Sequence, residues 1–102
     1  MAEPNVHLAE GHPGSLVRNA IRLRGWSVRE CALVLNTDLS TLGKVLGGDR
    51  PLTVGLALRL EAAGLGTAQG WVGRQRDYEL GRERERMAVD LADIRREAAW
   101  GH

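Results

Sequence analysis

The sequence predicts an all-α fold, and three observations support this prediction. Apolar residues recur at helical spacing in a series of short segments, and no segment shows the alternation of a convincing strand. Ser, Asp and Thr residues stand directly before several of these segments, where helix N-caps are expected. Glycines follow several of them, where helices commonly end. A chain of 102 residues is long enough for one small domain with a modest core.

The first helix is expected between Pro13, which suits a first helical turn, and Gly25, which stops the apolar pattern. Residues 1–12 are expected to form an irregular N-terminal tail, because Pro4 and Gly11 break any helical pattern there.

The second helix is expected to begin with a capping box, in which the side chains of Ser27 and Glu30 each bond the other residue's backbone amide. This helix runs to about Leu35 and buries Cys31 as a small core residue. A tight turn follows at Asn36, a residue type that tolerates a positive φ.

The third helix follows Asp38 as its N-cap and ends at Gly47, with Leu42 and Val45 facing inward. Its helical spacing places Ser40 on the opposite, outward side.

The fourth helix, at about residues 54–63, follows Thr53 as its N-cap. Thr67 caps a fifth segment, and from Leu80 the chain is expected to continue as one long polar helix to about Ala99.

Residues 27–46 therefore match a helix-turn-helix, in which the second helix lies in the major groove of DNA. Ser40 and Thr41 are expected to bond bases or phosphates, and Lys44 a phosphate or a guanine edge. Arg29 and Arg50 are candidate clamps on the phosphate backbone. The full set of expected DNA-binding residues is Arg29, Asp38, Leu39, Ser40, Thr41, Lys44 and Arg50.

Two residues of the third helix favour an interpretation other than DNA binding. Leu39 stands where a base-reading Arg or Gln would be useful, although it can contact a thymine methyl group, and Gly43 shortens the reading surface. Pairs of short capped helices also occur in domains that never touch DNA. A module that binds only proteins therefore stays open as an alternative.

Charge is distributed unevenly along the chain. The whole sequence has 14 basic against 13 acidic residues, which excludes a uniformly basic nucleic-acid coat. Residues 13–63 hold seven basic against four acidic residues, a net charge of +3, and residues 64–102 hold seven of each. The positive charge therefore lies where the helix-turn-helix is expected.

Several classes of protein are excluded or disfavoured. The single cysteine rules out an internal disulfide framework and a cysteine-based metal site, and His7 and His12 lie in the expected tail, far from His102. No catalytic arrangement stands out, so we expect no enzyme, no small-molecule substrate, no cofactor and no metal. No apolar run is long enough to span a membrane, and the first fourteen residues lack a basic signal-peptide region, which predicts a cytoplasmic protein.

Four polar or aromatic residues outside the helix-turn-helix are interpreted from their positions in the predicted helices. Arg59 either faces DNA or a partner, or packs its stem and pairs its head with a nearby acid. Trp71 and Tyr78 lie seven residues apart on one helix face, which suits the core or a dimer surface. Gln75 on that face is expected to satisfy a buried carbonyl.

The chain after residue 80 has its own pattern. Met87, Leu91, Ile94 and Ala98 recur at 4-3-4 spacing, a short heptad seam of less than two heptads. Such a seam must dock on something: its own domain, a second protomer or another protein. The candidate dimer or partner interface comprises Trp71, Tyr78, Met87, Leu91 and Ile94, and the chain divides into a tail (1–12), a DNA-binding domain (13–80) and a helical extension (81–102).

Four motifs carry a family resemblance over about residues 12–80: His12-Pro13-Gly14, Ser27-x-x-Glu30-x-Ala32-x-x-Leu35, Arg50-Pro51-Leu52-Thr53 through Ala57-x-Arg59-Leu60-Glu61, and Trp71-x-x-x-Gln75-x-x-Tyr78-Glu79-Leu80. With these motifs the chain resembles the HigA-type (VapI-type) antitoxins, a branch of the Xre/Cro-like helix-turn-helix regulators. The resemblance implies a five-helix, lambda-repressor-like domain with a long C-terminal helix. It also implies a bacterial, cytoplasmic homodimer that binds operator DNA and neutralises a RelE-like toxin that cleaves messenger RNA on the ribosome.

The chain departs from the family at the turn. The family usually has Gly, Val and Ser where this chain has Asn36, Thr37 and Asp38, and a polar residue or Arg where Leu39 stands. These departures bear on DNA recognition and leave the fold intact. A stand-alone transcriptional regulator of the same fold, without a toxin partner, is the alternative function.

Overall fold

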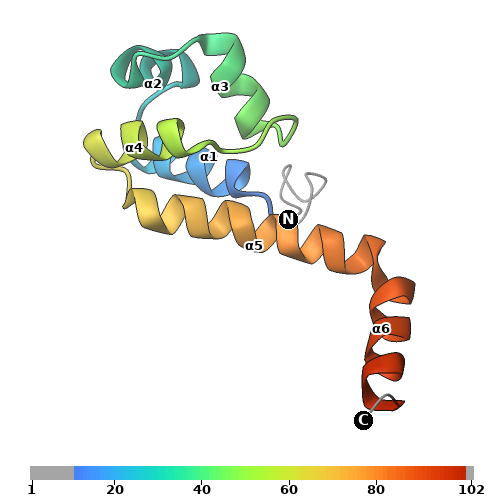
Figure 1. The fold of residues 1–102 in the computed structure, drawn as a ribbon. Helices are drawn as coiled ribbons and strands as arrows, with labels where there is room; N and C mark the ends of the chain where they lie inside the picture. The colour runs from blue at the N-terminus through green and yellow to red at the C-terminus, as the bar shows by residue number, and fades with distance from the viewer. Residues whose placement is uncertain (1–10, 101–102) are drawn as a thin grey trace.

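The computed structural model describes residues 11–100, and that part of the chain is helical without strands (Figure 1). Residues 1–10 of the expected tail, with His7, and His102 at the other end lie outside the described residues. The helices are α1 (Pro13–Leu23), α2 (Val28–Leu35), α3 (Leu39–Leu46), α4 (Val54–Ala62), α5 (Ala68–Arg86) and α6 (Ala88–Trp100). None of them is both long enough and apolar enough to cross a bilayer.

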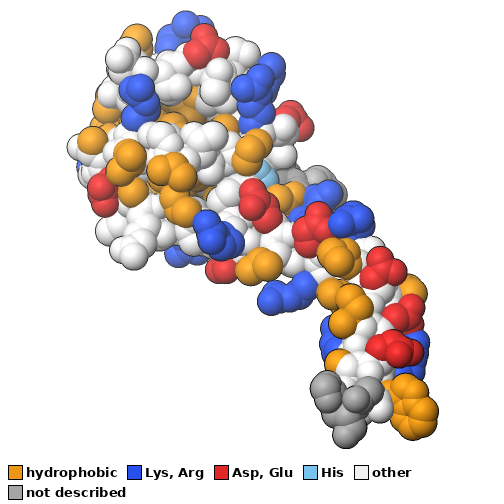
Figure 2. All heavy atoms as spheres, viewed as in Figure 1, with side chains coloured by type: hydrophobic (Ala, Val, Ile, Leu, Met, Phe, Trp, Pro, Cys, Tyr) orange, Lys and Arg blue, Asp and Glu red, His pale blue; other side chains and the backbone are white. Residues whose placement is uncertain are grey.

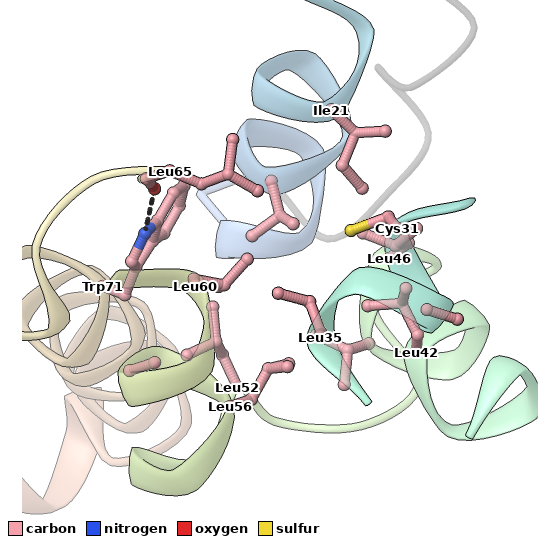
Figure 3. Packing of buried hydrophobic residues seen from close by; sticks show 14 residues of the cluster. Ile21, Cys31, Leu35, Leu42, Leu46, Leu52, Leu56, Leu60, Leu65 and Trp71 are labelled. Carbon is pink, nitrogen blue, oxygen red and sulfur yellow. Dashed lines mark hydrogen bonds between the residues drawn. The ribbon is translucent and has the colours of Figure 1, made fainter. Parts of the chain in front are cut away.

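The core lies between α1, α2, α3 and α4 and the first turns of α5 (Figure 3). Leu, Val and Ala side chains supply most of it, with one Trp, because the sequence offers only three Trp, one Tyr and no Phe. Leu42, Leu46 and Leu60 are its largest fully buried side chains, and Cys31 is buried among them. Burial withholds the Cys31 thiol from solvent and raises its pKa.

The predicted caps form as expected. Ser27 and Glu30 make both bonds of the capping box, with Glu30 N–H donating to Ser27 Oγ at 3.0 Å and Ser27 N–H donating to Glu30 Oε1 at 2.7 Å. Thr53 and Thr67 cap α4 and α5. Asn36 has φ +53° and ends α2 in the left-handed conformation, as predicted.

The start of α1 is more ordered than the sequence indicates. His12, expected at the end of an irregular tail, is instead the N-cap of α1, and its Nδ1 accepts a hydrogen bond from Gly14 N–H at 2.9 Å. Gly14 lies against the end of α3, where a Cβ would come within 2.3 Å of the Val45 carbonyl oxygen. The Arg18 guanidinium adds a bond to the Leu46 carbonyl at 3.2 Å. These contacts join α1 to the last turn of α3.

The C-terminal part differs from the expected single long helix. No break occurs at Leu80; α5 continues to Arg86, and after a bend at Met87 the chain turns into α6, which leaves the body of the molecule (Figure 1). The described part therefore has six helices, and the boundary between the last two lies at Met87 and not at Leu80. Proline and glycine are the usual sequence signals of a bend, and neither stands at Met87. The sequence therefore does not predict the bend.

Candidate nucleic-acid interface

The turn between α2 and α3 is held in place by a side chain from α4. The Arg59 guanidinium donates to the carbonyl oxygens of Leu35 at 2.9 Å and Asn36 at 3.2 Å. These are orphan carbonyls at the end of α2, which otherwise have no intrahelical partner. The expectation that Arg59 has a structural role agrees with these bonds, but its partners are backbone carbonyls and not an acidic side chain.

The buried side of α3 determines which residues face outward. Leu42, Val45 and Leu46 are buried in the core. At 100° per residue, the opposite side is centred on Ser40 and Lys44, and both are exposed. The structure therefore places these two predicted DNA-binding side chains next to each other on the outer face of α3.

Asp38 and Thr41 have a structural task at the start of α3. Asp38 Oδ2 accepts hydrogen bonds from the Thr41 backbone N–H at 3.0 Å and from the Thr41 hydroxyl at 3.3 Å. Asp38 is thus the N-cap that orients the first turn, and its negative charge does not suit a phosphate contact. The half-buried Thr41 has its hydroxyl proton engaged and retains its acceptor lone pairs.

Leu39 and Gly43, the two residues that disfavoured base recognition, leave the outer side of α3 accessible. Leu39 is 37% exposed, so part of its side chain is available to an apolar group such as a thymine methyl. A Cβ at Gly43 would meet nothing within 4 Å, so this position faces open space. Neither residue obstructs the approach of a groove to α3.

The basic side chains of the helix-turn-helix carry unneutralised charge. Arg29, Lys44 and Arg50 are exposed, and the ion pairs found in the described part of the chain lie elsewhere, in α5 and α6. Figure 2 shows Lys and Arg side chains over the end of the body formed by α2 and α3. Arg50 and Thr41 line the same hollow of about 270 Å³ between α3 and α4, whereas Arg29 lies outside it, in the first turn of α2. Arg50 is therefore the clamp candidate that the fold brings to α3.

His12, which the sequence did not indicate as part of this site, lies behind the loop that carries Arg50. His12 is 2% exposed and packs edge-on against Tyr78, with ring centroids 4.8 Å apart. Burial lowers the pKa of His12, and a hydrogen bond to the backbone of Arg50 acts in the opposite direction. His12 thus links the start of α1 to the loop that carries Arg50. The motif His12-Pro13-Gly14 was the signal that could have indicated it.

The fold is similar to that of an addiction module antidote protein of the HigA family from Coxiella burnetii, with a TM-score of 0.73 and 23% identity over 80% of this chain and 90% of that one. It is also similar to a protein from Nostoc punctiforme assigned as an antidote protein of a plasmid maintenance system, with a TM-score of 0.72 and 22% identity over 81% and 91% of the two chains. No protein-family model and no curated protein matches the sequence. The resemblance to HigA-type antitoxins that the motifs indicated is thus confirmed for the fold.

The residues expected at an interface fall into two groups. Trp71 is 7% exposed and donates from Nε1 to the Leu65 carbonyl at 2.7 Å, so it belongs to the core of its own domain and offers little surface to a partner. Tyr78 is half-buried against His12, and its hydroxyl accepts a bond from Arg82. Met87, Leu91 and Ile94, in contrast, lie at the bend and on α6, away from the core.

Gln75 and Glu61 have hydrogen-bond partners that the sequence did not indicate. Gln75 Oε1 accepts a bond from the Leu52 backbone N–H at 2.9 Å, so Gln75 satisfies a buried amide and not a carbonyl. Glu61 Oε2 accepts a bond from Ala68 N–H at 3.1 Å and supports the start of α5. Within residues 11–100, no three His, Cys, Asp or Glu side chains gather in a way that could hold a metal ion.

Proposed function

We propose that this protein is the antitoxin of a type II toxin-antitoxin module and that, as a homodimer, it represses its own operon. The observation that carries the proposal is the outer face of α3, where Ser40 and Lys44 stand exposed on a helix-turn-helix. The fold of that scaffold is similar to two proteins assigned as antidote proteins. The proposal implies a location in the bacterial cytoplasm.

In this proposal α3 enters the major groove of operator DNA. Ser40 and Lys44 reach base edges, with Leu39 against a thymine methyl, while Arg29 and Arg50 bind phosphates on either side. Asp38 acts through the cap that orients α3 and makes no contact of its own. Arg59 acts in the same indirect way, because it holds the turn that precedes α3.

Dimerisation serves both specificity and affinity. A net charge of +3 over residues 13–63 is modest, so one protomer alone binds DNA weakly. Two copies of α3 about one helical turn apart read an inverted repeat, and the bound dimer blocks the promoter. Binding of this kind falls steeply as the salt concentration rises.

The partner in this proposal is a small RelE-like toxin that cleaves messenger RNA on the ribosome. Support comes from the sequence resemblance and from the similarity of fold to antidote proteins. The antitoxin would neutralise the toxin by covering its RNA site or its access to the ribosome.

Two measurements test the proposal. The first is a gel shift of the chain's own promoter region at low salt, and the second is rescue of growth when this protein is expressed with the product of the adjacent gene. A shift together with rescue supports the full proposal. A shift without rescue or co-purification supports the stand-alone regulator. No shift at low salt refutes DNA binding and leaves the module that binds only proteins.

A further inference from the structure

Helix α6 is the part of the molecule that the fold leaves without a partner. None of its residues is buried, and it extends beyond the body after the bend at Met87 (Figure 1). Ile94 is 59% exposed, and Met87 and Leu91 are only half-buried. The seam (Met87, Leu91, Ile94 and Ala98) therefore does not dock on its own domain in this structure.

The charges on α6 are arranged around the seam in a defined way. With Leu91 and Ala98 at a positions and Ile94 at d, residues 90 and 97 occupy g positions and residue 95 an e position; Met87 falls at the preceding d position but lies at the bend, one residue before α6. The g side is acidic, with Asp90 and Glu97, and the e side has Arg95. Arg86 pairs with Glu83 and Arg96 with Asp93, whereas neither Asp90 nor Arg95 has an ion pair within residues 11–100. Figure 2 shows both signs of charge along this helix.

We propose that α6 pairs in parallel with α6 of a second copy of this chain, seam against seam. In a parallel pair each g residue faces the e′ residue five positions further along the other helix, so Asp90 of each protomer faces Arg95 of its partner. In an antiparallel pair g faces g′, which brings Asp90 close to the acidic Glu97. The charge pattern therefore selects a second copy in the parallel orientation.

The strength of this contact follows from its length. The seam is shorter than two heptads, so the pair associates weakly as free protein in solution. Two protomers that occupy neighbouring half-sites on one operator have a high effective concentration, and the same weak contact then holds them together. This use of the contact rests on the proposed function, whereas the pairing itself does not.

Cross-linking of the full chain tests the orientation. Ala98→Cys places a thiol at an a position, where parallel helices bring residue 98 next to its own copy, and Ala99→Cys is the matched control one residue away on the outer side. The wild-type chain, whose single cysteine is buried, sets the background. We expect mild oxidation to give at least about tenfold more disulfide dimer for Ala98→Cys than for Ala99→Cys. Equal yields for the two variants overturn the proposal.

Charge exchange in the Ala98→Cys chain tests the partner residues. Asp90→Arg alone and Arg95→Asp alone each bring like charges together twice per dimer, and each is expected to reduce dimer yield about tenfold. The combined variant D90R/R95D restores opposite charges and is expected to recover the yield. Residues 90 and 95 do not face each other on one helix, so recovery reports on contact between chains. Failure of the combined variant to recover overturns the proposal.

Gel shifts on the same variants separate this inference from the proposed function. If cross-linking is not specific but DNA binding stays intact, the pairing of α6 is refuted and the proposed function is not. Specific cross-linking without any gel shift supports the pairing and refutes operator binding.

Discussion

Substitution of Gly14 by alanine sets two physical effects against each other. Alanine has a higher helix propensity than glycine, by up to about 1 kcal/mol, which by itself favours Gly14→Ala. However, the added Cβ would lie 2.3 Å from the Val45 carbonyl oxygen and 2.9 Å from that of Leu46. Both oxygens belong to the backbone, so relief of the clash requires α1 to shift away from α3.

The clash is expected to outweigh the propensity. Overpacking in a filled site typically costs about 1–3 kcal/mol, and a rigid backbone neighbour places Gly14→Ala at the upper end. We expect a lower free energy of unfolding and a fall in melting temperature of about 4–8 °C for each kcal/mol lost. Thermal and urea denaturation of the full chain, followed by circular dichroism, measure both quantities.

Gly43 provides the matched control. It also lies in a helix, but its Cβ would meet no atom within 4 Å, so only the propensity and the unfolded-state entropy change. Gly43→Ala is therefore expected to stabilise the protein by up to about 1 kcal/mol. A Gly14→Ala variant as stable as wild type would show that α1 does not approach the end of α3 closely enough for a Cβ to clash there.

Three further predictions concern the site. Arg59→Met keeps the apolar stem but leaves the Leu35 carbonyl without its charged donor. We expect the free energy of unfolding in urea to fall by about 1.5–3 kcal/mol, and operator binding to weaken. Unchanged stability would contradict the proposed support of the turn by Arg59. Lys44→Ala is expected to leave stability within about 0.5 kcal/mol, to weaken the gel shift, and to lower the salt slope by about one unit if Lys44 binds a phosphate; an unchanged shift would exclude Lys44 from the interface. The pKa of His12 is lowered in the folded protein, so folding favours the neutral imidazole. The free energy of unfolding is therefore expected to be constant above about pH 6.5 and to fall as the pH drops below that value. Denaturation experiments that give the same free energy of unfolding from pH 7 to pH 5 would refute this.

Local signals in the chain identified most of the helix-turn-helix. Helix ends could be read from Ser27, Asp38 and Thr53, because an N-cap acts on amides only two or three residues away. The left-handed Asn36 and the outward position of Ser40 follow from equally local rules, the tolerance of Asn for positive φ and the 3.6-residue period.

Partners that lie far apart in the sequence could not be read in the same way. Arg59 and Gln75 bond backbone groups more than 20 residues away, and many carbonyls and amides compete for such side chains until the helices have packed. The burial of His12 against Tyr78 likewise depends on α1 and α5 meeting. Periodicity indicated the apolar face that contains Trp71, but only packing showed that its own domain covers that side chain.

The order of the helices, their caps and the seam of α6 thus follow from the sequence, because each depends on residues within one or two turns. The tertiary structure decided which outward residues stand together: Arg50 beside Thr41 at one hollow, and Arg59 behind the turn. It also decided that α6 leaves the body after Met87, where no proline or glycine announces a bend. That bend leaves the seam exposed, because a helix that does not lie against its own core has no neighbour there to bury its apolar side.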